Sequence, residues 1–231
     1  MDNLAVFATK TANTAITDRN ARKLVAETAR VLMADGQMTI TIQPDTLLDT
    51  LVSNHVLTRS GDMPGYSFQH QQFQEWYASH YVERLMLQAV SDPAARKKLK
   101  ADVFDQRPWE EAVLFAVERS ARGDAAHKAA CCAAIRAAFN VDPVLAGEMI
   151  FRATDEAWAP IGTEMRSLAE QWHSPGKVDR AVRFMIASGR PEFGDLLWPL
   201  ISHANTQVHL PALRAAKQFR PSVLGNDALA C

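Results

Sequence analysis

The chain has 231 residues, and its 25 Lys and Arg side chains nearly balance its 26 Asp and Glu side chains, which leaves a formal net charge of −1. This balance excludes an overall positive field that would draw the chain to nucleic acid or to an anionic membrane. No apolar run reaches the roughly 20 residues that a membrane-spanning helix needs, and the N-terminus lacks the pattern of a secretory signal. We therefore expect a cytoplasmic protein with no membrane partner.

Helical and β patterns alternate in the first part of the chain. Residues 1–17 are predicted to be a linker. A helical stripe of apolar residues covers residues 18–34 and is followed by Gly36, a common helix stop. The alternating run Met38 to Gln43 favours a short strand, and Pro44 then opens a second helix that ends near Asn54.

A hairpin and a long helix are predicted next. The β-favouring runs 56–59 and 66–69 are joined by SGDMPG, whose Gly, Asp and Pro residues suit a turn. A helical pattern then extends from residue 70 to about residue 90. Helix, short strand, helix, hairpin and long helix are the order expected of a winged-helix domain with a C-terminal helix, which we place at residues 18–91.

Large apolar residues recur in this long helix at three- and four-residue spacing, which puts them on one face and favours a packing stripe. They are Phe73, Trp76, Tyr77, Tyr81 and Leu85. His70 stands at the start of the helix, where free backbone N–H groups and the positive end of the helix dipole can hold an anion.

The segment also resembles the Phe-x-His-x-x-Phe-Gln-Glu-Tyr-Phe-Ala-Ala signature near the end of the winged-helix domain of NACHT-type ATPases, which are signal-transduction proteins of the STAND class. In that family the histidine reaches the phosphates of bound ADP and holds the closed, inactive state. The resemblance therefore implies that His70 senses a nucleotide, and it covers about residues 17–90. Trp76 replaces the usual Tyr or Phe, and Ser79 replaces a frequent Ala. The matching residues are Phe68, His70, Phe73, Gln74, Glu75, Trp76, Tyr77 and Ala78.

After residue 92 the strand signals disappear, and Ala-rich helical segments alternate with breaks rich in Gly and Pro. Segment starts near Pro108, Pro143, Pro175 and Val208 recur every 32 to 35 residues, which is typical of stacked helical hairpins. We expect a HEAT-like α-solenoid over residues 92–231. The helix containing Trp109 also resembles the Trp-x-Glu-x-x-x-Phe helix that follows the motif in bacterial NACHT proteins.

Several candidate sites have simpler interpretations. A histidine at a helix start can serve only as a local cap, and Gln74 and Glu75 are more simply helix-packing residues than catalytic ones. His127 and Cys131 are spaced i and i+4, as metal ligands can be, but no second pair completes a site. We therefore interpret Cys131 as a buried small residue and assign no metal and no catalytic residue.

Three cysteines, the third being Cys231, are too few and too poorly spaced for a disulfide framework, so we expect reduced thiols. The run from Arg96 to Lys100 is the one basic cluster, and we interpret it as a solvated helix face. The segment PDTLLDTLVSN, where a winged helix would read DNA, contains two acids and no base, so DNA binding is not expected.

The sequence contains no phosphate-binding loop. We therefore expect no enzyme activity and no cofactor in this chain, with ADP or ATP and Mg²⁺ only in a complete parent protein. The chain is predicted to be the regulatory and sensor portion of such an ATPase. Its partners would be an upstream nucleotide-binding domain in cis and a protein trigger on the repeats, and its context is defence signalling. The alternative is a helical-repeat scaffold for protein interactions, in which the His70 motif only packs. A third hypothesis is a thiol or metal enzyme that uses Cys131 and His127.

Overall fold

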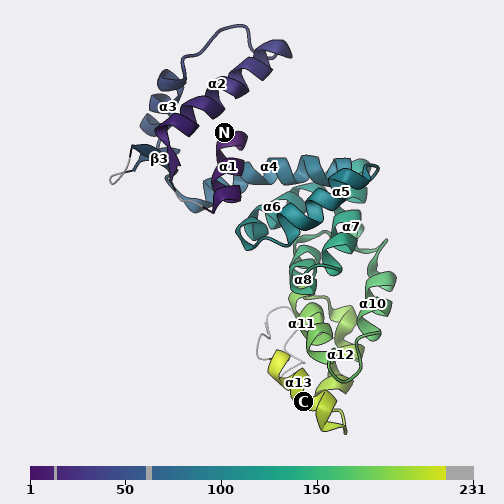
Figure 1. The fold of residues 1–231 in the computed structure, drawn as a ribbon. Coiled ribbons are helices and arrows are strands. Elements are labelled where there is room, and N and C mark those ends of the chain that lie inside the picture. The colour runs from purple at the N-terminus through teal and green to yellow at the C-terminus, as the bar shows by residue number, and fades with distance from the viewer. Residues whose placement is uncertain (13–14, 61–63, 217–231) are drawn as a thin grey trace. The chain divides into compact units, whose positions relative to one another are not determined.

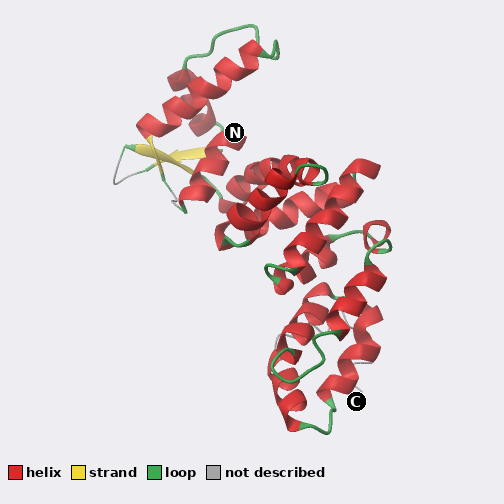
Figure 2. Ribbon diagram, turned by 45° about the vertical axis from the view of Figure 1, so that its right-hand side comes forward, coloured by secondary structure: helices red, strands yellow, loops and turns green. Residues whose placement is uncertain are grey.

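The computed structural model describes residues 1–12, 15–60 and 64–216. The described chain is mainly helical with one small three-stranded sheet, which confirms the mainly α class (Figure 2). It forms two compact units, Met1–Val82 and Glu83–Cys231, and the division falls inside the long helix α4 (Gln71–Ala89). Among the described helices, none combines the length and the apolar composition that crossing a bilayer requires.

Unit 1 contains the sheet. Its elements before α4 are α1 (Asp2–Thr11), β1 (Ile16–Thr17), α2 (Asp18–Ala34), α3 (Pro44–Ser53), β2 (Leu57–Arg59) and β3 (Gly65–Phe68). The strand order is β1-β3-β2, and both pairs are antiparallel. Helix α2 packs on α3 and contacts β3, so the two helices and the sheet share one core (Figure 1).

Local chemistry explains these elements. The Thr17 hydroxyl accepts a hydrogen bond from the Asn20 backbone N–H and caps α2, and Pro44 occupies the first turn of α3, where no intrahelical N–H is needed. Ile16 and Leu48 are almost fully buried. Gly65 allows β1 to approach β3, since a Cβ atom there would lie 2.5 Å from the Ile16 carbonyl oxygen.

Three details differ from the sequence prediction. Residues 2–11 form α1 instead of a linker, with Leu4 and Ala8 buried. Residues 38–43 form no strand, because this segment has no neighbouring strand to pair with. The two-residue strand β1 was not anticipated, since two residues carry no period. The predicted helices at 18–34 and 44–54 and the antiparallel hairpin are confirmed, although residues 61–63 of its turn lie outside the described part.

Unit 2 is built from short helices joined by tight turns. After α4 they are α5 (Pro93–Leu99), the π-helical turn η1 (Lys100–Phe104), the 3-10 turn η2 (Arg107–Trp109), α6 (Glu110–Ala121), α7 (Ala125–Phe139), α8 (Pro143–Arg152), α9 (Asp155–Trp158), α10 (Gly162–Glu170), α11 (Val178–Ser188), the 3-10 turn η3 (Pro191–Phe193), α12 (Gly194–Ile201) and α13 (Thr206–Ala216). Asp and Thr side chains cap several of the helix starts.

Helices of unit 2 pack mainly on their neighbours one hairpin away. Helix α8 packs against α6, α7 and α11, and α11 packs against α13 (Figure 1). Ion pairs follow the same offset: Arg136 binds Glu164 at 2.7 Å and Arg166 binds Asp195 at 2.5 Å, over separations of 28 and 29 residues. Such exposed pairs contribute little stability each, so the buried faces of the helices hold the unit together.

Helices α8 and α11 approach each other closely at Gly147. A Cβ atom there would lie 2.8 Å from both the Ala187 Cβ and the Phe184 carbonyl oxygen. We expect Gly147→Ala to lower the free energy of unfolding by about 1–3 kcal/mol through overpacking, although Ala is by itself the better helix former. Urea denaturation followed by circular dichroism measures the change.

Gly194→Ala is the matched control, because a Cβ atom at that helical glycine would meet its nearest neighbour, the Trp198 Nε1 atom, at an ordinary 3.7 Å. This control is expected to be neutral or slightly stabilising. Equal unfolding midpoints for the two variants would contradict the close α8–α11 contact.

Candidate functional site

His70 and the preceding Gln69 join β3 to α4. His70 is exposed, and its ring meets the edge of the Phe73 ring with a centroid separation of 5.4 Å and an interplanar angle of 72°. Its carbonyl oxygen accepts a hydrogen bond of 3.0 Å from the Phe73 backbone N–H, which fixes the first turn of the helix. The imidazole is therefore held at the end of α4 where backbone N–H groups lack intrahelical acceptors.

Helix α4 has two contrasting faces. Ala78, Ser79 and Val82 are fully buried, whereas Phe73 and Trp76 are 39% and 43% exposed. Since each residue turns the helix by about 100°, Phe73 and Val82 lie on opposite sides. The predicted packing stripe is therefore wrong for Phe73 and Trp76, whereas Leu85 of the same stripe is buried. Periodicity finds a stripe but does not tell how much of it other elements cover.

The other motif residues are anchored within unit 1. Phe68 is buried and contacts the Tyr77 ring at a centroid separation of 6.5 Å. The Gln74 side-chain amide donates to the Thr9 hydroxyl at 3.1 Å, and Glu75 accepts a hydrogen bond from Gln71 at 2.6 Å. These contacts hold the motif residues in the fold of unit 1.

Contacts between α1 and α4 orient the helix. His80 lies 3.1 Å from an Asp2 carboxylate oxygen, and its ring meets the Trp76 ring at a centroid separation of 5.7 Å. Lys10 lies over the Tyr81 ring at 5.2 Å. The anchored side of α4 thus fixes the direction in which its exposed aromatic side chains point.

This region forms the candidate site, which we call the α4 aromatic face: His70, Phe73 and Trp76. It offers hydrogen-bond donation from one imidazole and from the first-turn N–H groups, with the Phe73 ring against the imidazole and the exposed Trp76 ring three residues further along the helix. An anionic group is the ligand that this combination suits.

Trp109, the motif residue predicted for the following helix, lies in η2 of unit 2 and is only 2% exposed. Its burial indicates a role in packing.

Cys131 and Cys132, the cysteines in the described part of the chain, are both buried. Burial raises the pKa of the Cys131 thiol to about 12 and also raises the pKa of Cys132, whose thiol donates to the Ala157 carbonyl oxygen at 3.2 Å. His127 instead lies 2.7 Å from an Asp124 carboxylate oxygen, which also caps α7. Among the described residues no group of three or more metal-binding side chains comes together.

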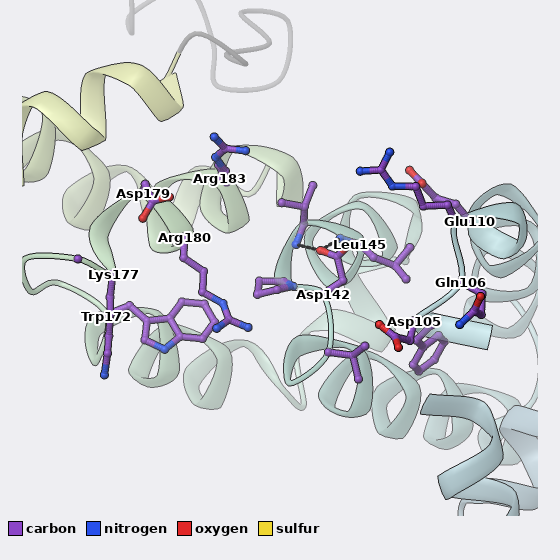
Figure 3. Close-up of a pocket in the computed structure, with 16 residues that line it drawn as sticks. Asp105, Gln106, Glu110, Asp142, Leu145, Trp172, Lys177, Asp179, Arg180 and Arg183 are labelled. Carbon is purple, nitrogen blue, oxygen red and sulfur yellow. Dashed lines mark hydrogen bonds between the residues drawn. The ribbon is translucent and has the colours of Figure 1, made fainter. Parts of the chain in front are cut away.

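A cavity of about 770 Å³ in unit 2 was not anticipated from the sequence (Figure 3). The η1–η2 segment, the α7–α8 turn, the α10–α11 connection and α11 line it. A possible signal in the sequence was the recurrence of basic residues every third position at Lys177, Arg180 and Arg183. That pattern alone is typical of a solvated helix face, and only the three-dimensional structure shows that these basic residues line a cavity.

Comparison with protein-family models, with curated proteins and with solved structures gives no match to the chain.

Because both described thiols are buried and protonated at neutral pH, we expect Cys131 and Cys132 to resist alkylation by iodoacetamide at pH 8 in the native protein and to react in denaturing urea. Peptide mass spectrometry measures modification at each site. Raised thiol pKa values also mean that stability falls as the pH rises above about 9, where only the unfolded thiols ionise. Native modification as fast as that in urea would contradict this burial.

Proposed function

We propose that the chain is the regulatory and sensor portion of a NACHT-type STAND ATPase, with a winged-helix domain followed by a HEAT-like helical-repeat segment. The observation that carries this proposal is the α4 aromatic face, in which His70 and two exposed rings stand at a helix start. In the proposed arrangement an upstream nucleotide-binding domain in cis covers this face, and His70 donates a hydrogen bond to a phosphate of ADP. ADP or ATP with Mg²⁺ is then held by the complete parent protein.

The element order supports the winged-helix part. Helices α2 and α3 precede the β2–β3 hairpin, β1 adds the third strand, and α4 follows. A role in protein contact fits its charges better than DNA binding does, because Arg59, the one base of the hairpin strands, is paired with Asp49 at 2.5 Å. Phosphate contacts on DNA need uncompensated positive charge.

Neighbour-to-neighbour packing supports the repeat part. Helices α6, α8, α11 and α13 begin at intervals of 33, 35 and 28 residues; the first two fall within the predicted 32 to 35 residues, and the last is shorter. Each packs on the next one along the chain. A stack of this kind offers an extended surface to a protein trigger, and defence signalling is the context that the resemblance implies.

An upstream partner domain also accounts for further apolar side chains that lie exposed in unit 1. Val31 is 57% exposed and Ile40 is 72% exposed, on and just after α2. An apolar cavity of about 180 Å³ between α1, α2 and α3 lies near them, lined by Leu24, Leu32 and Ile42 among others. Exposed apolar patches of this kind are typical of protein contacts.

The alternative is a helical-repeat scaffold without any link to a nucleotide, in which the α4 aromatic face serves another protein. Anchoring of Gln74 and Tyr77 within unit 1 is equally compatible with it. The two proposals differ in what the His70 imidazole does.

His70→Asn in the complete parent protein tests the proposed function. Asn is a good helix cap, so this variant keeps the start of α4 and removes only the imidazole. A hydrogen bond to a charged phosphate contributes about 1.5–3 kcal/mol, so we expect ADP release to become about ten- to a hundredfold faster with an unchanged melting temperature. Stopped-flow release of a fluorescent ADP analogue gives the rate.

Gln72→Ala on the same exposed turn is the matched control and should leave ADP release unchanged. If His70→Asn releases ADP at the wild-type rate, His70 is a helix cap and the scaffold alternative is favoured.

A further inference from the structure

The cavity of unit 2 has the size of a ligand site. Its volume of about 770 Å³ lies within the roughly 300–1,000 Å³ that is usual for such sites. Its walls come from segments far apart in sequence, between Phe104 and Arg183, so the folded unit and not a single loop creates it. We call it the α11 groove after the helix that supplies its basic wall.

Four cations line the α11 groove: Arg107, and three on or next to α11. Lys177, Arg180 and Arg183 are exposed, and none has an ion pair with any residue in the described part of the chain. Elsewhere in unit 2, Arg136 and Arg166 are each matched by a carboxylate of the adjacent hairpin. The cations on α11 therefore remain available to an anionic partner.

An aromatic stack holds the central cation in place. The Arg180 guanidinium lies 4.7 Å from the centroid of the Trp172 ring, and Trp172 stacks on the buried Phe139 at 4.4 Å with an interplanar angle of 4°. Stacking restricts the guanidinium but leaves its N–H edge free to donate two parallel hydrogen bonds to a carboxylate. Less conformational entropy is lost when a ligand binds a group that is already ordered.

The opposite end of the groove carries charge of both signs, because its lining segment contains Asp105 and Glu110 with Arg107 between them in sequence. Figure 3 shows Asp105 and Glu110 at one end and Trp172 and Arg180 at the other. Asp142 also lines the groove, but its carboxylate caps α8 and accepts hydrogen bonds from the first N–H groups of that helix at 2.8 and 3.2 Å. A uniform polyanion such as nucleic acid would meet repulsion from the Asp105 and Glu110 carboxylates.

We propose that the α11 groove binds an acidic peptide segment of a partner protein. The carboxylates of the segment lie at Arg180 and Arg183, and its backbone N–H groups donate to Asp105 and Glu110. A peptide carries both carboxylates and N–H donors along one chain, which suits a groove of mixed charge. This inference rests on the proposed function, since it names the chemistry that the sensor segment recognises.

The test uses the full chain and a short fluorescein-labelled peptide of alternating glutamate and alanine, with fluorescence anisotropy as the readout. A glutamine–alanine peptide is the neutral control. We expect the glutamate peptide to bind more tightly and to lose affinity as salt is added. Arg180→Gln/Arg183→Gln should weaken binding about tenfold or more, because each charge-assisted hydrogen bond is worth about that factor.

Lys97→Gln/Lys98→Gln removes the same charge from the basic cluster on α5, outside the groove, and should leave the affinity unchanged. Arg183→Gln alone, at an exposed side chain with no hydrogen bond or ion pair in the described part of the chain, should give an intermediate loss and guards against a folding defect in the double variant.

Equal affinity for the two peptides would overturn the proposal, as would equal losses from the two double variants. Tighter binding of single-stranded DNA, lost with Arg180→Gln/Arg183→Gln, would make the groove a nucleic-acid site instead. None of these outcomes changes ADP release by His70→Asn, so failure of the groove is distinguishable from failure of the proposed function.

Discussion

The burial of small side chains on α4 is the constraint on which the candidate site depends. Ala78, Ser79 and Val82 have no exposed surface, so the side of the helix opposite Val82, where Phe73 lies, faces outward, and Trp76 on the neighbouring part of the surface is 43% exposed. Hydrogen bonds and ring contacts from α1 fix this rotation of α4. Two large aromatic side chains held outward beside an imidazole are costly to leave in water, and this is the physical argument for a partner that covers them.

In unit 2, the α11 groove arises in a similar way, because one face of α11 is buried and the other is exposed. Close packing at Gly147 lets α8 and α11 share a core, which turns the cations of α11 toward solvent. Glu164 and Asp195 are bound to the cations of adjacent hairpins, whereas no ion pair in the described part of the chain holds the cations of α11. The unmatched charge of the α11 groove therefore follows from how the helices stack, and it gives that surface a chemical preference.

Much of the fold follows from the sequence, because strong local signals decide it. Capping residues and apolar periods located α2, α3, α4 and the hairpin to within a few residues. Helix α1 was missed because a short segment without a strong cap gives a weak signal, and β1 because its two residues pair only in three dimensions. The motif located His70, but the side of α4 that is buried and the groove between distant helices depend on tertiary packing, which one sequence does not encode locally.

The most direct measurement of the central claim is hydroxyl-radical footprinting of the complete parent protein in its ADP and ATP states. Mass spectrometry reports the oxidation of each aromatic side chain, and Trp109, which is 2% exposed, serves as an internal control that stays protected. The account predicts that Phe73 and Trp76 are protected with ADP and become oxidised with ATP, when the α4 aromatic face is released. Equal oxidation of Trp76 in both states, at the rate found for the isolated chain, would contradict it.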